Sequence, residues 1–142
     1  MQDSIERTID IDAPLERVWS LVTDAGWWIP VAAPTEPVRA VGGVAIRDSE
    51  WGRFPVEVVE LRPMTYASFR WASLFPGEDL TRHNTTLIEF TLEASGDGVR
   101  VSVLETGFSQ LDAPDELKAR EIEANSGGWT AQLDVLRGLA ES

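Results

Sequence analysis

The sequence contains no cysteine and only one histidine, His83. The absence of cysteine excludes disulfides, zinc sites built from thiolates and catalysis by a thiol. A metal ion would have to be held by carboxylates and His83 alone, and we expect neither a metal nor a cofactor. His83 lies in the polar segment LTRHNTT, where no partner is evident. It is therefore interpreted as a solvated loop residue rather than an acid–base catalyst.

Positive charge is scarce. The chain has 24 acidic residues against 12 basic ones, which gives a formal net charge of -12 at pH 7. Such a charge repels nucleic acids and anionic lipid surfaces at long range. The arginines and the single lysine are spread along the chain, so no basic patch opposes this repulsion. We expect no nucleic-acid partner.

Long apolar runs are also missing. The longest uncharged run, Ala25 to Thr35, is broken by proline and falls far short of the ~20 residues that a membrane-spanning helix needs. The N-terminal sequence MQDSIERTID is acidic and lacks the apolar core of a secretory signal. We therefore expect a cytoplasmic protein without a membrane span.

Familiar catalytic motifs do not occur. The sequence has no nucleophile elbow, P-loop, HExxH helix or dinucleotide-binding fingerprint. An enzyme built on this chain would have to use inward-facing carboxylates, arginines or Tyr66. We assign no catalytic residue.

The 142 residues suffice for one domain, residues 1–142, with a substantial core. Ser4 to Ile11 alternates apolar and polar residues and predicts a strand, with Arg7 as a charged exception on the apolar face. The segment DAPLERVWSLVTD follows, and its apolar residues recur at spacings of three and four after Pro14. This pattern predicts an amphipathic helix, which the GWWIP segment ends.

The region from Val38 to Glu105 predicts strand after strand. PVRAVGGVAIRD indicates a hairpin around Gly42 and Gly43, and FPVEVVEL, YASFRW, TLIEFTLEA and VRVSVLE follow. An antiparallel meander is the simplest arrangement, and Glu105 continues the apolar face of its last strand. The clearest inward-facing residues are Ala67, Phe69, Trp71, Ile88, Phe90, Leu92, Val99, Val101 and Val103.

The last segment opens with DAPDE and then repeats apolar residues at helical spacing. Gly127 and Gly128 interrupt it without shifting the phase, so one continuous helix is predicted, with a break into two helices as the alternative. The missing side chains would leave room either for tight packing or for a ligand. The apolar stripe is Ala119, Ile122, Ser126, Trp129, Leu133, Leu136 and Ala140.

Several blocks resemble, in order, those of the activator of heat-shock-protein-90 ATPase homologue family within the START-like superfamily. They are IDIDAPLERVWSLVTD, GWW, VGG, VVELRPMTYASFRW, VRVSVLETGF and GGWTAQLDVL. The resemblance implies an α+β helix-grip fold, in which a curved antiparallel sheet wraps around a long C-terminal helix and encloses a cavity. It also implies two short helices after the first strand.

Members of this superfamily include lipid carriers, hormone receptors, polyketide cyclases and co-chaperone domains, so the fold alone does not choose a function. The leading hypothesis is a noncatalytic domain that holds a small apolar or amphipathic ligand between sheet and helix. One alternative is a cyclase or isomerase in which Arg7, Glu105 or Tyr66 polarises a carbonyl. Another is a module that binds a chaperone or other protein. Under any of these hypotheses we expect a monomer or a homodimer.

Two of the candidate ligand contacts are charged, and they face the expected cavity from the first and last strands. These strands are neighbours in a helix-grip sheet, so Arg7 is predicted to pair with Glu105 or another inward carboxylate, because an unpaired buried guanidinium is costly. The alternative is that Arg7 extends along the strand edge to water. The full set is Arg7, Trp28, Phe69, Trp71, Phe90, Glu105 and Trp129.

Overall fold

Six strands and two α-helices form in the computed structural model, which describes residues 3–30 and 36–142. Alternating apolar residues set the strands, and prolines at 14 and 114 directly precede the two helices. In chain order the elements are β1 (Ser4–Ile11), α1 (Leu15–Val22), β2 (Val44–Ser49), β3 (Gly52–Arg62), β4 (Tyr66–Trp71), β5 (Thr86–Ser95), β6 (Gly98–Thr106), the 3-10 turn η1 (Phe108–Gln110) and α2 (Asp115–Glu141).

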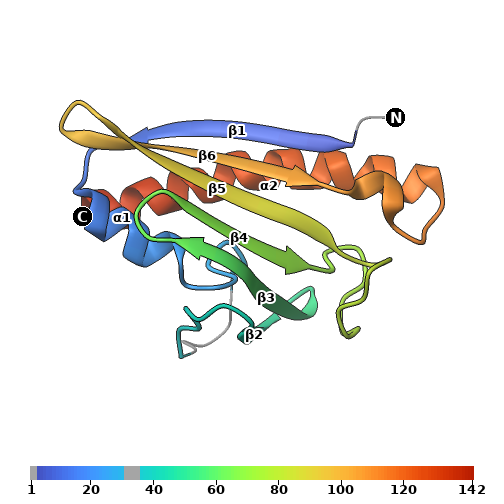
Figure 1. Ribbon diagram of the computed structural model, residues 1–142. Helices are drawn as coiled ribbons and strands as arrows, with labels where there is room; N and C mark the ends of the chain where they lie inside the picture. Colours follow the sequence, from blue (N-terminus) through green and yellow to red (C-terminus); the bar gives the residue numbers. More distant parts are fainter. Residues whose placement is uncertain (1–2, 31–35) are drawn as a thin grey trace.

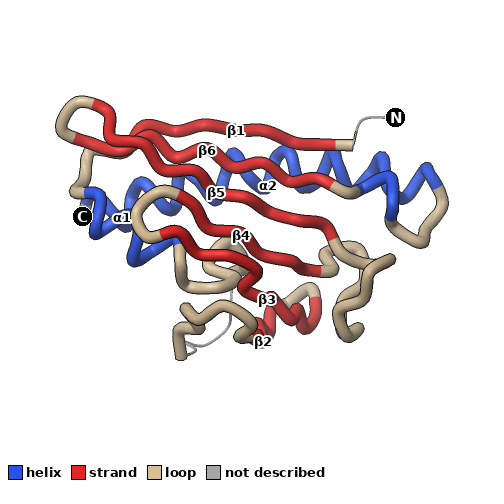
Figure 2. The backbone as a smooth tube through the Cα atoms, viewed as in Figure 1, coloured by secondary structure: helices blue, strands red, loops and turns tan. Residues whose placement is uncertain are grey.

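The strands of the described residues form one antiparallel sheet in the order β1-β6-β5-β4-β3-β2. β2 to β6 follow one another as a meander, and β1 closes the far edge beside β6. In the view of Figure 1, α2 runs behind β1, β6 and β5, while β3 and β2 lie away from it. Figure 2 shows the same division between strands and helices. The expected helix-grip arrangement is thus confirmed.

The core lies between the inner face of the sheet and α2. All nine residues predicted to face inward from the last three strands are buried. α2 packs along β1. From Ile122 onward the residues of the predicted stripe are buried apart from Ser126, which is half-buried. At its start the stripe is wrong, because Ala119 is exposed and Lys118 is buried instead. The Lys118 ammonium donates a hydrogen bond to the Ser109 carbonyl oxygen at 2.9 Å.

The prediction of a second short helix after the first strand is wrong for residues 23–30. Two successive turns replace it. In the first the Trp27 amide donates a hydrogen bond to the Asp24 carbonyl, and in the second the Ile29 amide donates one to the Gly26 carbonyl, each at 2.9 Å. Gly26 has a φ of 80°, which a helix cannot accommodate and which glycine tolerates. The turns carry Trp28 into the interior, where it is 4% exposed.

The predicted hairpin around Gly42 and Gly43 is also wrong. These two glycines form backbone hydrogen bonds with Val58 in β3, and residues 38–41 are not a strand. The hairpin that forms joins β2 to β3, where Ser49 pairs with Gly52. Within residues 36–142 the meander therefore has five strands, where the sequence predicted six.

The prediction of one continuous C-terminal helix is confirmed, since α2 runs through both glycines. A Cβ atom added at Gly127 or Gly128 would meet nothing within 4 Å. The tight-packing explanation for these glycines is therefore wrong. No helix in the described ranges has the length and apolar character needed to cross a membrane.

Arg47 in β2 fastens the turns after α1 to the sheet. It is 5% exposed, and its guanidinium donates hydrogen bonds to the Ala25 carbonyl at 2.8 and 2.9 Å and to the Asp24 carboxylate at 2.6 Å. Gly26 lies against it, because a Cβ there would come within 2.8 Å of the Arg47 side chain. The position of Trp28 depends on this link.

We expect Arg47→Leu to lower the free energy of unfolding by about 2–3 kcal/mol, because it leaves the Asp24 carboxylate and a buried carbonyl without their donor. The matched control is Arg53→Leu in the same hairpin. Arg53 and Asp48 are mostly exposed, so the control should lose less than about 1 kcal/mol. Urea unfolding measures both, and equal losses would contradict the role given to Arg47.

Candidate functional site

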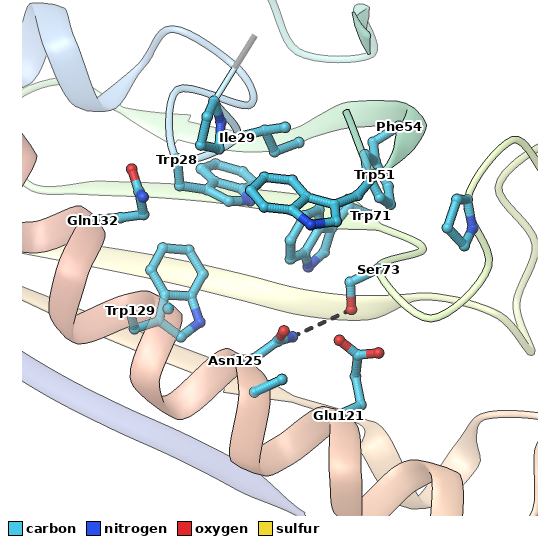
Figure 3. Close-up of a pocket in the computed structure, with 14 residues that line it drawn as sticks. Trp28, Ile29, Trp51, Phe54, Trp71, Ser73, Glu121, Asn125, Trp129 and Gln132 are labelled. Carbon is cyan, nitrogen blue, oxygen red and sulfur yellow. Dashed lines mark hydrogen bonds between the residues drawn. The ribbon is translucent and has the colours of Figure 1, made fainter. Parts of the chain in front are cut away.

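A pocket of about 450 Å³ is open to solvent and lies beside α2. Its other walls come from residues 28–30, the β2–β3 turn, β3, the end of β4 and the loop that follows β4. α2 packs toward the β1 edge of the sheet, which leaves this space on the opposite side. Figure 3 shows the α2 side chains on one side of the pocket and the tryptophans of the sheet and turns on the other. The lining residues are Trp28, Ile29, Pro30, Trp51, Phe54, Trp71, Ser73, Pro76, Glu121, Ala124, Asn125, Gly128, Trp129 and Gln132.

Trp28 occupies the centre of an aromatic cluster. Its ring centroid lies 5.5 Å from that of Phe69, 5.6 Å from those of Trp71 and Trp129, and 5.8 Å from that of Phe90. Phe69 and Phe90 are fully buried and form a layer behind the pocket wall. Of the five predicted aromatic contacts, Trp28, Trp71 and Trp129 therefore line the pocket, and the two phenylalanines support them.

Glu105 lies at the base of this wall with 0% exposure. Its Oε1 accepts hydrogen bonds from Trp129 Nε1 at 2.8 Å and Asn125 Nδ2 at 3.2 Å. Its Oε2 accepts from Trp71 Nε1 at 2.9 Å and Thr86 Oγ1 at 2.6 Å. One carboxyl thus joins β4, β5 and β6 to α2, entirely through neutral donors.

Burial raises the pKa of Glu105 above its ordinary value of about 4.5, and the hydrogen bonds that favour its charged form offset only part of that effect. Indole and amide N–H groups can only donate, whereas the Thr86 hydroxyl can also accept. A protonated Glu105 can therefore donate from Oε2 to Thr86 without losing either indole. The site accommodates both protonation states.

The polar side of the pocket comes from one face of α2. Glu121, Asn125 and Gln132 line it, and Asn125 Nδ2 also donates to Ser73 Oγ at 3.2 Å. Burial and the neighbouring charge of Glu105 raise the pKa of Glu121 above its ordinary value, while a hydrogen bond with Ser73 acts in the opposite direction. Asn125 thus connects the pocket wall to the buried Glu105.

The predicted pairing of Arg7 with Glu105 is wrong. The sheet register places Ile5, not Arg7, opposite Glu105. The Arg7 guanidinium instead donates to the Glu6 carbonyl at 2.8 Å and to Thr130 Oγ1 at 3.3 Å, and no ion pair forms with it among the described residues. Arg7 extends along the strand edge, which was the alternative considered, and it does not line the pocket.

Tyr66 also lies apart from the pocket. Its hydroxyl donates to the Glu89 carboxylate at 2.6 Å, and it alternates with the buried Ala67 along β4. Arg7, Glu105 and Tyr66, the groups considered for polarising a carbonyl, are therefore not brought together. His83 is exposed on its loop, as expected.

Sequence reasoning missed several lining residues. Trp51 and Pro76 lie in turns whose positions depend on the folded sheet, so nothing in the sequence identified them. Glu121, Asn125 and Gln132 could have been found, because they share one helix face beside Trp129 with Gly128, which was expected to leave room for a ligand. That face is distinct from the apolar stripe on which the prediction relied.

Two indole N–H groups find no acceptor in the described part of the chain. Nε1 of Trp27 and Nε1 of Trp28 are buried and have no hydrogen-bond partner among the described residues. A buried donor without an acceptor costs free energy that an acceptor would recover. No group of three or more His, Cys, Asp and Glu side chains suited to a metal ion occurs in the described ranges.

Comparisons with known proteins agree with this architecture. The sequence model for the family described as Activator of Hsp90 ATPase homolog 1-like protein matches residues 12–141. Protein MLL2253 from Mesorhizobium loti is 22% identical, with a TM-score of 0.72 over 96% of this chain and 95% of that one. The Aha1 dimer from Colwellia psychrerythraea has a TM-score of 0.74 at 17% identity, over 99% of this chain and 97% of its own.

CalU16 from Micromonospora echinospora is 18% identical, with a TM-score of 0.65 over 96% of this chain and 75% of that one. At these identities the likeness shows the fold alone. No curated protein sequence matches the chain.

We expect Glu105→Gln to destabilise the protein by about 1–3 kcal/mol at about pH 5, because the amide nitrogen must face the indole N–H of either Trp71 or Trp129. Glu93→Gln, on the exposed side of β5, is the control and should change stability by no more than about 0.5 kcal/mol. Urea unfolding measures both. Wild-type stability in the Glu105 variant would show that the two indole hydrogen bonds are not required.

The same residue should make stability depend on pH. A carboxyl whose pKa is raised by folding stabilises the protein fully below its ordinary value of about 4.5, and this contribution is lost as the pH rises through the raised value. The stability of the wild type minus that of Glu105→Gln should therefore fall as the pH rises from about 4.5. Glu121 titrates in both proteins, so the effect of its burial cancels, and its coupling to the charge of Glu105 remains part of the difference. A flat difference between pH 4.5 and 8 would contradict the raised pKa.

Proposed function

The chain belongs to the family of Activator of Hsp90 ATPase homolog 1-like proteins, and from that premise we propose that it binds a small amphipathic molecule, mainly aromatic, in the pocket beside α2. The observation that carries the proposal is the pocket itself. Its volume of about 450 Å³ and its predominantly apolar wall, rich in tryptophan and with a few polar side chains at one side, are typical of small-molecule sites.

The polar groups support an amphipathic rather than a purely apolar ligand. Gln132 offers an amide donor and acceptor and Asn125 offers its carbonyl oxygen, while the Trp28 indole N–H has no acceptor among the described residues. An oxygen atom on a ligand that reached this N–H would recover the cost of leaving it unpaired. The aromatic wall would contact the remainder of the molecule.

The arrangement favours binding over catalysis. An acid–base enzyme would need titratable groups that converge on the open space, and Glu121 is the one titratable side chain among the described residues that line the pocket. Glu105 lies behind Asn125, and Arg7 and Tyr66 lie elsewhere. We therefore place the enzyme alternative behind ligand binding.

Self-association is the second candidate. β2 is an edge strand, and Val41, Val44 and Ile46 on or beside it are exposed, as is Trp51 in the following turn. Exposed apolar side chains along an edge strand are suited to a protein partner, for which a second copy of the chain is the simplest choice. Light scattering on the purified protein would distinguish a monomer from a dimer.

Gly128 and Gly127 provide a matched pair of variants for the pocket. Both glycines are exposed in α2 with open space around them, but only Gly128 lines the pocket. Leucine at either position should maintain or raise the melting temperature, since leucine favours a helix over glycine by about 0.5–1 kcal/mol. Only Gly128→Leu should fill the pocket and abolish binding.

The binding measurement uses N-phenyl-1-naphthylamine, a neutral aromatic dye whose fluorescence rises in apolar surroundings. We expect saturable binding to the wild type and to Gly127→Leu, and none to Gly128→Leu. Native mass spectrometry of the freshly purified wild type should show a co-purified small molecule that the Gly128 variant lacks. Equal dye binding by the two variants would place the dye elsewhere and overturn the proposed site.

A further inference from the structure

The charge on the pocket wall is negative. Glu121 is the one charged side chain among the described residues that line the pocket, and no arginine or lysine contributes to the wall. The basic groups nearest to it in the chain are engaged elsewhere. Lys118 bonds to the Ser109 carbonyl and Arg120 pairs with Glu116. A ligand in the pocket meets a carboxyl group and no cation from the protein.

Two of the pocket tryptophans do not offer their N–H groups to a ligand. Trp71 and Trp129 both direct Nε1 at Glu105, away from the pocket, and their hydrogen bonds fix these orientations. The face of an indole ring carries negative electrostatic potential, and the N–H edge carries the positive end. Donation to an acceptor oxygen also moves electron density from the N–H toward the ring. The buried Glu105 therefore makes both indole rings more electron-rich.

Four tryptophans reach this space from separate parts of the chain. Trp28 comes from the turns after α1, Trp51 from the β2–β3 hairpin, Trp71 from the end of β4 and Trp129 from α2. Figure 3 shows Trp28, Trp51 and Trp71 on one side, across from Trp129, Asn125 and Glu121 on the helix. One carboxyl and several indole rings around a single space favour a cation over an anion, because a cation is attracted to the face of an indole ring.

We propose that the ligand is an alkylated ammonium cation attached to an apolar or aromatic group, held by the tryptophan faces, with Glu121 as its counter-ion. This inference rests on the proposed binding function and specifies its ligand class. Alkylation matters because a bare ammonium is strongly hydrated and costly to remove from water, whereas a trialkylammonium is an apolar surface that carries a charge. The protein's net charge of -12 adds a long-range attraction for such a cation.

The test compares two probes of the same shape. Phenyltrimethylammonium and tert-butylbenzene differ in having nitrogen or carbon at the branched centre, and so in charge alone. Ligand-observed NMR titrations give their affinities for the wild type, Glu121→Gln and Glu123→Gln. Glu123 lies two residues from Glu121, is exposed and does not line the pocket. It therefore controls for the loss of one negative charge on α2.

We expect the cation to bind the wild type about fivefold or more tightly than its neutral isostere. Glu121→Gln should remove most of that difference by weakening cation binding while leaving the isostere unchanged. Glu123→Gln should leave both affinities within about twofold, because its charge is solvated and screened. Melting temperatures of both variants confirm that the fold is intact.

Several results would overturn the inference. If the isostere binds as tightly as the cation and Gly128→Leu abolishes its binding, the pocket is a neutral site, and the proposed function stands without the cation. Equal weakening in the two glutamate variants would show a general charge effect and remove Glu121 as the counter-ion. If neither probe binds, and N-phenyl-1-naphthylamine also fails, both the inference and the proposed function are wrong.

Discussion

One buried carboxyl group organises this structure. Glu105 accepts hydrogen bonds from β4, from the start of β5 and from two residues of α2, so it fixes the helix to three neighbouring strands at one end of the core. A fully buried carboxylate without a cation is costly, and the cost is reduced here by neutral donors and by a raised pKa. The same bonds set how Trp71 and Trp129 face the pocket. Core stability and pocket chemistry therefore depend on the same group.

α2 has two functional faces that differ by about one residue in phase. Ile122, Trp129 and Leu133 represent the face that packs on the sheet, and Glu121, Asn125 and Gly128 represent the face that lines the pocket. Trp129 belongs to both, since its ring lies at the boundary and its N–H reaches Glu105. Gly128 has no side chain, so the second face stays open, and no neighbouring atom requires a glycine there. The free volume of the pocket is therefore independent of the stability of the helix.

The sheet, its inward faces and the long helix could be predicted because each follows from local periodicity, and Glu105 was identified because it continues such a face. The errors arose where the outcome depended on register or on a single backbone angle. Arg7 and Glu105 lie on adjacent strands, yet the register sets Ile5 opposite Glu105. The predicted second helix does not form because Gly26 has a φ of 80°. Glycine at this position also leaves room for the Arg47 side chain, which packs directly against it. Trp51 joins the site only after the β2–β3 hairpin has formed, so its role has no local sequence signal.

The crowding of the indoles also gives the protein a particular optical behaviour. Trp27, Trp28 and Trp129 lie with ring centroids 5.6–6.5 Å apart, and Trp28 and Trp71 lie 5.6 Å apart. At such separations electronic excitation passes between rings faster than it is emitted as light. Trp27, Trp28, Trp71 and Trp129 therefore share their excitation, and a molecule that quenches the fluorescence of one of them lowers the emission of all four. The intrinsic ultraviolet emission of the chain is therefore a label-free report on whether the space beside α2 is occupied.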